Sequence, residues 1–229
     1  NLRPIIIGGR TGVGKTLFLK SISSYINLEE LAGHRGSSFG SHPIPQPTQI
    51  NFENKLSISL LRILNQGNEL CAIEDESSNI GKRHIPKPFY KTMSESPIIV
   101  LKANLDERIN VTLQEYITNS LKEYESLYEE DLAFDIWSKN LMESLSRLKK
   151  RLGGDNYQSI KKMMVEAINF HSKNGETDLH KGWIESLLIN YYDSMYKYQL
   201  NKKKERIIFE GTKLELYSFL NENYKIKKI

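Results

Sequence analysis

The 229-residue sequence predicts an α/β fold in which helices flank a parallel β-sheet. Compact apolar runs at residues 4–7, 69–73 and 96–101 are typical of strands buried on both faces. A glycine-rich turn joins the first run to a segment with helical periodicity. Helical periodicity also dominates from about 106 to 190, and a strand-like pattern follows at about 196–210. We therefore expect one P-loop NTPase-like (kinase-like) domain over residues 1–229, with a helical insertion before the last strands.

Composition limits the class of protein. Hydrophobic residues make up 39% of the chain, enough for a core, and a net charge of +4 is compatible with a polyanionic partner. The single cysteine rules out an internal disulfide and suggests a reducing compartment. No apolar run approaches the ~18–20 residues of a membrane span, and no signal-peptide pattern opens the chain. We expect a cytoplasmic protein with no membrane partner.

The glycine-rich turn fits the P-loop pattern G-x-x-x-x-G-K-[ST] at every position. Its glycines let backbone N–H groups wrap an oligophosphate, Lys15 adds a full positive charge, and Thr16 is placed to ligate Mg²⁺. The motif predicts a phosphate site but does not say what carries the phosphate. The expected phosphate-binding residues are Gly9, Arg10, Thr11, Gly12, Val13, Gly14, Lys15 and Thr16.

The helix after this turn is expected to run to about Ile26, where a short apolar piece at 25–28 suits a second parallel strand. Residues 29–40 are rich in glycine and small hydroxyl side chains, a composition that favours an anion-contacting loop. Prolines keep residues 42–47 extended, and a helix resumes from Gln49 to Leu64.

Carboxylates follow the apolar run 69–73 directly. At the end of a buried strand next to a P-loop strand, this is the Walker B location, so either Glu74 or Asp75 should hold Mg²⁺ or position a reacting group. The alternative is that these acids only begin a solvated loop. Another loop at 77–88 contains Arg83, a candidate contact for anions.

The C-terminal part is expected to supply the last strands of the sheet. A turn at 153–155 should separate two helices of the insertion, and strands are expected at 196–200 and 206–210. The last helix should span 213–223, with Thr212 as its N-cap.

Several segments taken together resemble a known family. They are residues 28–40 (LEELAGHRGSSFG), 46–49 (QPTQ), 74–77 (EDES), 151–154 (RLGG) and 191–193 (YYD). With the P-loop, they are similar to the P-loop part of tRNA 2-selenouridine synthase, and the similarity extends over nearly the whole chain. The His34-Arg35-Gly36-Ser37 stretch is more specific than the P-loop, which many unrelated enzymes share.

The resemblance implies an enzyme that modifies the wobble base of tRNA. A geranyl group passes from geranyl diphosphate to the sulfur of 2-thiouridine, and selenium from selenophosphate then replaces the geranylthio group. Catalytic residues would be Lys15, Thr16, His34, Arg35 and Asp75, with Mg²⁺ as cofactor on Thr16, Asp75 or Glu74. The family adds a rhodanese domain, which this sequence lacks; it is either a separate partner subunit or was trimmed away.

Contacts to substrate or tRNA are expected from two groups of residues: Arg35, Gly36, Ser37, Ser38 and Arg83 near the motif, and Lys202, Lys203, Lys204 and Arg206 near the C-terminal end. Basic side chains can meet phosphates, and nearby tyrosines can stack on a base. A solvated surface is the alternative for each basic cluster, and residues 149–151 form a further candidate cluster.

A rival function is an NTP-dependent kinase or ATPase acting on a small molecule or RNA. It would use Lys15 and Thr16 on phosphates, Asp75 on Mg²⁺, and Arg83 or Arg108 as the finger. A non-catalytic tRNA-binding subunit would leave the P-loop and the adjacent carboxylates unused. Binding of geranyl diphosphate or of ATP with Mg²⁺ distinguishes these functions.

Overall fold

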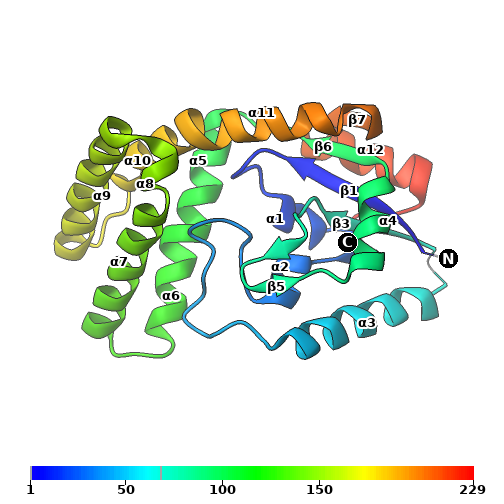
Figure 1. Cartoon of the computed structure of the whole chain (residues 1–229), viewed down its shortest axis with the longest axis horizontal. Helices are drawn as coiled ribbons and strands as arrows, with labels where there is room; N and C mark the ends of the chain where they lie inside the picture. The colour runs from blue at the N-terminus through cyan, green and yellow to red at the C-terminus, as the bar shows by residue number, and fades with distance from the viewer. Residues whose placement is uncertain (1, 68) are drawn as a thin grey trace.

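A computed structural model describes residues 2–67 and 69–229. Its five-stranded sheet has the order β2-β3-β1-β6-β7, and every pairing is parallel (Figure 1). The α/β class predicted from the sequence is thus confirmed. The central strand β1 lies between β3 and β6, so the P-loop that follows it emerges in the middle of one sheet edge. The strands are β1 (Arg3–Gly9), β2 (Tyr25–Ile26), β3 (Leu70–Glu74), β6 (Ile98–Leu101) and β7 (Ile207–Gly211).

Helices cover both faces of the sheet because successive residues of β1 point to opposite sides. Ile5 and Ile7 pack in one core with α1 (Lys15–Leu19) and α12 (Lys213–Tyr224). Ile6 belongs to the core on the other face, together with residues of α2 (Leu28–Ala32), α3 (Gln49–Asn65) and α4 (Lys87–Glu95).

The helical insertion lies between β6 and β7 and has a separate core built around Trp137, Ile160 and Trp183. Figure 1 shows it as a bundle beside the sheet, joined to it by α5 and α11. Its elements are α5 (Leu105–Leu113), the π-helix η1 (Gln114–Thr118), α6 (Asn119–Glu125), α7 (Glu130–Arg147), α8 (Lys149–Leu152), α9 (Gly154–Asn174), α10 (His180–Leu187), the π-helix η2 (Leu188–Tyr192) and α11 (Asp193–Lys202).

Three expectations about local structure are wrong. The segment 29–40, expected to be a loop, begins with the helix α2, which Asn27 caps and which continues to Ala32. The P-loop helix α1 ends at Leu19, well short of Ile26, and the fully buried Ile22 instead forms an antiparallel bridge with Lys228. Residues 196–200 are not a strand but part of α11, so β7 alone completes the sheet after the insertion. The alternation of large apolar residues there also fits a helix, in which Tyr196 and Leu200 share one face and Tyr198, 63% exposed, points away.

Other local expectations are confirmed. Helix α3 begins at Gln49, the break at Gly153 separates α8 from α9, and α12 begins after Thr212. The loop 77–88 contains a small hairpin of β4 (Asn79–Ile80) and β5 (Arg83–His84), and the short 3₁₀-helix η3 (Lys204–Arg206) precedes β7. Across the described residues, no helix combines the length and apolar character that a membrane crossing requires.

Candidate active site

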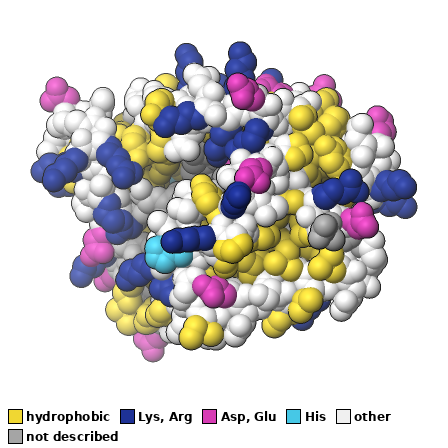
Figure 2. Space-filling view, turned by 45° about the vertical axis from the view of Figure 1, so that its right-hand side comes forward, with side chains coloured by type: hydrophobic (Ala, Val, Ile, Leu, Met, Phe, Trp, Pro, Cys, Tyr) yellow, Lys and Arg dark blue, Asp and Glu magenta, His cyan; other side chains and the backbone are white. Residues whose placement is uncertain are grey.

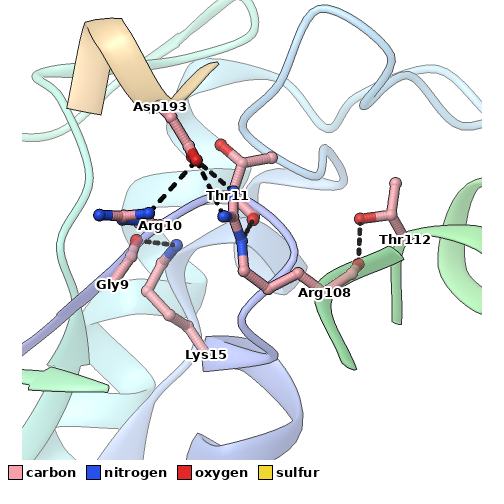
Figure 3. A network of polar contacts seen from close by, with 7 residues as sticks. All are labelled: Gly9, Arg10, Thr11, Lys15, Arg108, Thr112 and Asp193. Carbon is pink, nitrogen blue, oxygen red and sulfur yellow. Dashed lines mark hydrogen bonds and ion pairs between the residues drawn. The ribbon is translucent and has the colours of Figure 1, made fainter. Parts of the chain in front are cut away.

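The P-loop turn is held tightly against the insertion. Gly12 has φ +79°, and a Cβ atom there would lie 2.6 Å from Thr112 Oγ1 and 2.7 Å from the Arg108 carbonyl oxygen, both on α5. Only glycine fits this approach. The Lys15 ammonium group donates to the Gly9 carbonyl oxygen at 3.2 Å, so it folds back over the loop that would hold a phosphate group (Figure 3).

A mostly buried ion pair also holds the loop, with side chains 3% exposed for Arg108 and 23% for Asp193. Arg108 donates from Nη2 and Nη1 to the two Asp193 carboxylate oxygens at 2.6 and 3.0 Å, and from Nε to the Thr11 carbonyl oxygen at 2.9 Å. Arg10 approaches the same carboxylate at 3.3 Å (Figure 3). The guanidinium group of Arg108 is thus engaged in positioning the loop, which leaves it poorly suited to act as the finger of a kinase or ATPase.

Carboxylates converge on Thr16 at the start of α1. The Thr16 hydroxyl lies 3.1 Å from Glu74 Oε1 and 3.0 Å from Glu29 Oε2, and the Glu29 N–H donates to Glu74 Oε2 at 3.0 Å. Burial, followed by the neighbouring Glu29 carboxylate, raises the pKa of Glu74 to about 8. Burial also raises the pKa of Glu29 and, more strongly, that of Glu76. Glu29 and Glu76 were not predicted as site residues, although both lie in the family-like segments 28–40 and 74–77.

Asp75 lies next to this cluster but has a different partner. Its carboxylate accepts from the Lys203 ammonium group at 2.5 Å, and both side chains are mostly buried. Asp75, one of the residues expected to hold Mg²⁺, is therefore paired with Lys203, which was expected to contact tRNA. Of the two Walker B candidates, Glu74 is the one that faces Thr16.

These residues fit a Mg²⁺ ion that is also held by substrate phosphate. The ion prefers oxygen ligands and usually keeps few protein ligands, and Thr16 and Glu74 supply a hydroxyl and a buried carboxylate side by side. Within residues 2–67 and 69–229, no group of three or more acidic, histidine or cysteine side chains has a spacing that holds a metal alone. The substrate would have to complete the coordination.

His34 and Arg35 line a polar cleft that also contains Thr16. Arg35 pairs with Glu123 of α6, which also contacts His42 Nδ1 at 2.7 Å. His34 Nδ1 accepts the Gly36 N–H at 3.1 Å, and burial lowers the pKa of His34, which favours the neutral ring. The cleft thus joins the predicted histidine and arginine to acids that the sequence did not identify.

A separate, apolar pocket also reaches the P-loop. Thr11 of the P-loop and Ser37 line it together with aromatic and aliphatic side chains, mostly from the insertion: Phe39, Thr112, Tyr116, Trp183, Ile184, Leu187, Leu188 and Tyr192. Phe39 and Trp183 pack at 5.8 Å between ring centroids. The two hollows therefore both begin at the P-loop, one polar and one apolar.

The remaining predicted contact residues are spread over the surface. Arg206 donates to the carbonyl oxygens of Met93 and Ser96, and the Ser38 carbonyl oxygen accepts from Arg147, so these groups have structural partners. Lys202 lies over the Tyr198 ring at 4.3 Å, and Lys204 is exposed. Figure 2 shows Lys and Arg side chains in several separate groups on the face it presents.

Cys71 and Arg83 have no evident part in this site. Cys71 is fully buried in β3, and burial raises the pKa of its thiol to about 12, so it is an inert core residue. Arg83 lies in the β4-β5 hairpin, and its buried Nε has no hydrogen-bond partner among the described residues.

Comparison with known proteins identifies the family. Residues 2–227 match the tRNA 2-selenouridine synthase AAA domain. Proteins named tRNA 2-selenouridine synthase from Sulfurovum sp. (strain NBC37-1), Shewanella sediminis and Pseudomonas putida are 40%, 42% and 39% identical over 96%, 95% and 94% of this chain. The chain spans 60%, 59% and 59% of the length of these relatives. It belongs to the tRNA 2-selenouridine synthase family and corresponds to the P-loop part of its members.

Proposed function

We propose that this chain transfers a geranyl group from geranyl diphosphate to the sulfur of wobble 2-thiouridine in tRNA. Selenium substitution from selenophosphate would follow with the help of a rhodanese domain or subunit. The observation that carries the proposal is the apolar pocket that begins at the P-loop turn, where Thr11 lines it. A phosphate loop next to an apolar pocket suits a ligand with a diphosphate head and a hydrocarbon tail.

The P-loop would stabilise the leaving group. As the sulfur bonds to C1 of the geranyl chain, the C1–O bond breaks and its electron pair leaves with diphosphate. The base loses its N3 proton to water, so the S-geranyl product is neutral. Lys15 would turn from the Gly9 carbonyl oxygen to the diphosphate, adding to the charge stabilisation by the loop N–H groups. Mg²⁺ on Thr16 and Glu74 would supply further charge neutralisation.

The apolar pocket would hold the prenyl chain. It is narrow as it stands, so the chain must displace side chains such as Tyr116 and Tyr192 to enter. Burial of the chain would contribute about 25 cal/mol per Å² of apolar surface removed from water. Exclusion of water would also protect the geranyl carbon from hydrolysis.

The polar cleft would receive the tRNA base, because Thr16, His34 and Arg35 all line it. Neutral His34, with Nδ1 accepting from Gly36, presents Nε2 as a hydrogen-bond donor. Arg35, Gly36, Ser37 and Ser38 would border the reacting atoms, and the exposed Lys202 and Lys204 would contact tRNA phosphates farther away.

Ligand-dependent thermal stability tests the proposal against an ATPase or kinase. Geranyl diphosphate with Mg²⁺ should raise the melting temperature, and ATP with Mg²⁺ should raise it less at equal concentration. Inorganic diphosphate, which lacks the prenyl tail, is the matched control. It should raise the melting temperature by less than geranyl diphosphate does. A larger shift with ATP would favour the rival function.

Product analysis tests the division of labour. Nucleoside mass spectrometry of digested tRNA should show S-geranyl-2-thiouridine after incubation without ATP, and little 2-selenouridine unless a rhodanese protein is added. The buried Cys71 thiol cannot replace a rhodanese cysteine. Efficient selenation by this chain alone, or geranylation that requires ATP, would contradict the proposal.

A further inference from the structure

Helix α3 has a second, exposed apolar face. Phe52, Leu56 and Ile63 point into the core, where they are 0%, 2% and 7% exposed. On the opposite side, the exposed fractions are 70% for Ile50, 48% for Ile58, 58% for Leu61 and 42% for Leu64. At about 100° per residue these four side chains fall within one stripe along the helix.

No charged residue interrupts this stripe. The positions between its apolar members are Asn54 and Ser57, and the charged residues of the helix, Glu53, Lys55 and Arg62, lie at its margins or beyond. In a chain with 26% charged residues, an uncharged exposed face of this length is typical of a contact surface. Helix α3 runs along the lower border of the molecule in Figure 1.

The stripe extends from the polar cleft to the start of β1. Its N-terminal end lies beside the polar cleft, since residues 43–45, 47 and 55 line that cleft and Ile44, 62% exposed, extends the apolar surface to its mouth. Its C-terminal end lies near the start of β1 in Figure 1, and the Arg3 N–H donates to the carbonyl oxygen of Glu69, four residues after α3 ends, at 2.6 Å. A polypeptide joined ahead of β1 would emerge next to this face.

We propose that the exposed face of α3 docks the part of the family polypeptide that this chain does not span. The relatives devote about 40% of their length to that part, since the chain covers 60% of the Sulfurovum protein. Docking there would place a reactive group of the partner at the mouth of the cleft that receives the base. The inference rests on the proposed function, in which the partner completes the selenium step.

A binding experiment tests the docking surface. The segment of the Sulfurovum relative outside the 220 matched residues, made as a separate polypeptide, is titrated with the parent chain and with the double variant I58E/L61E. We expect the parent to bind and the double variant to lose at least about tenfold in affinity, because two buried apolar contacts become buried charges. The matched control is L214E, at a 74% exposed position of α12.

The outcomes separate this inference from the proposed function. All three proteins should bind geranyl diphosphate equally, because α3 contributes no residue to the P-loop or the apolar pocket. Absence of binding by the parent, or equal binding by I58E/L61E, would overturn the docking surface and leave the proposed function intact. A parent chain that dimerises, with I58E/L61E monomeric, would assign the face to a second copy instead and also overturn the inference.

Discussion

The sheet and the helical insertion contribute to one site in different ways. The sheet half provides a P-loop at the end of β1 and a carboxylate at the end of β3, parts that proteins with unrelated substrates share. The insertion provides Arg108 and Asp193, which hold the loop, and most of the apolar pocket wall. In the proposed function, the phosphate chemistry would therefore come from the common half, and the shape that selects a ligand would come from the insertion.

The largest effect should come from the sheet half. Lys15→Ala removes a charge that serves the ligand and contributes nothing to the core, so diphosphate affinity should fall by about 100-fold or more while the melting temperature without ligand stays unchanged. Calorimetric titration with geranyl diphosphate measures this. Lys91→Ala, at an exposed position of α4, is the control and should bind like the parent. Equal affinity of Lys15→Ala and the parent would mean that the loop holds a different ligand.

The insertion should contribute through its buried ion pair. Arg108→Met leaves Asp193 with only the exposed Arg10, and the free energy of unfolding should fall by about 3 kcal/mol, the low end for a broken buried pair. Urea denaturation measures this change. Arg10→Met removes the exposed pair and should cost less than about 1 kcal/mol. If Arg108→Met loses stability but keeps full diphosphate affinity, the insertion does not position the P-loop.

Sequence reasoning recovered the sheet half better than the insertion. Buried parallel strands and a P-loop have local signatures, so the strand of residues 69–73 and the turn that ends at Thr16 could be placed without a structure. The Arg108–Asp193 pair joins residues 85 positions apart and follows only from packing. Residues 196–200 were misassigned because their alternating apolar pattern fits a strand as well as one face of α11.

The two carboxylates after β3 allow a sharper test of the sheet half. Glu74→Gln should lower the geranylation rate by about 100-fold and weaken its dependence on Mg²⁺, because Glu74 contacts Thr16. Asp75→Asn should lower the rate by about tenfold or less, since its main partner is Lys203. Rates are measured across a Mg²⁺ titration. The reverse order of effects would return the metal role to Asp75.

The smallest expected effect distinguishes the halves by pH. Burial, and then the neighbouring His171, lowers the pKa of His180 in the insertion core to about 3, whereas an unfolded histidine has a pKa of about 6.5. As the pH falls below 6.5, His180 binds a proton in the unfolded chain but stays neutral in the folded insertion. The free energy of unfolding therefore falls by about 1.4 kcal/mol per pH unit, or roughly 2 kcal/mol at pH 5. The effect of Glu74 in the sheet half has the opposite sign. Because its pKa is raised, the folded state binds the extra proton between about pH 8 and 4.5, so the contribution of Glu74 to the free energy of unfolding increases as the pH falls.

Hydrogen exchange at pH 7 and pH 5 should therefore show α9 and α10 losing protection before β1 and β3, and His180→Gln should reduce that difference. Equal loss of protection in both halves would mean that they unfold as one unit.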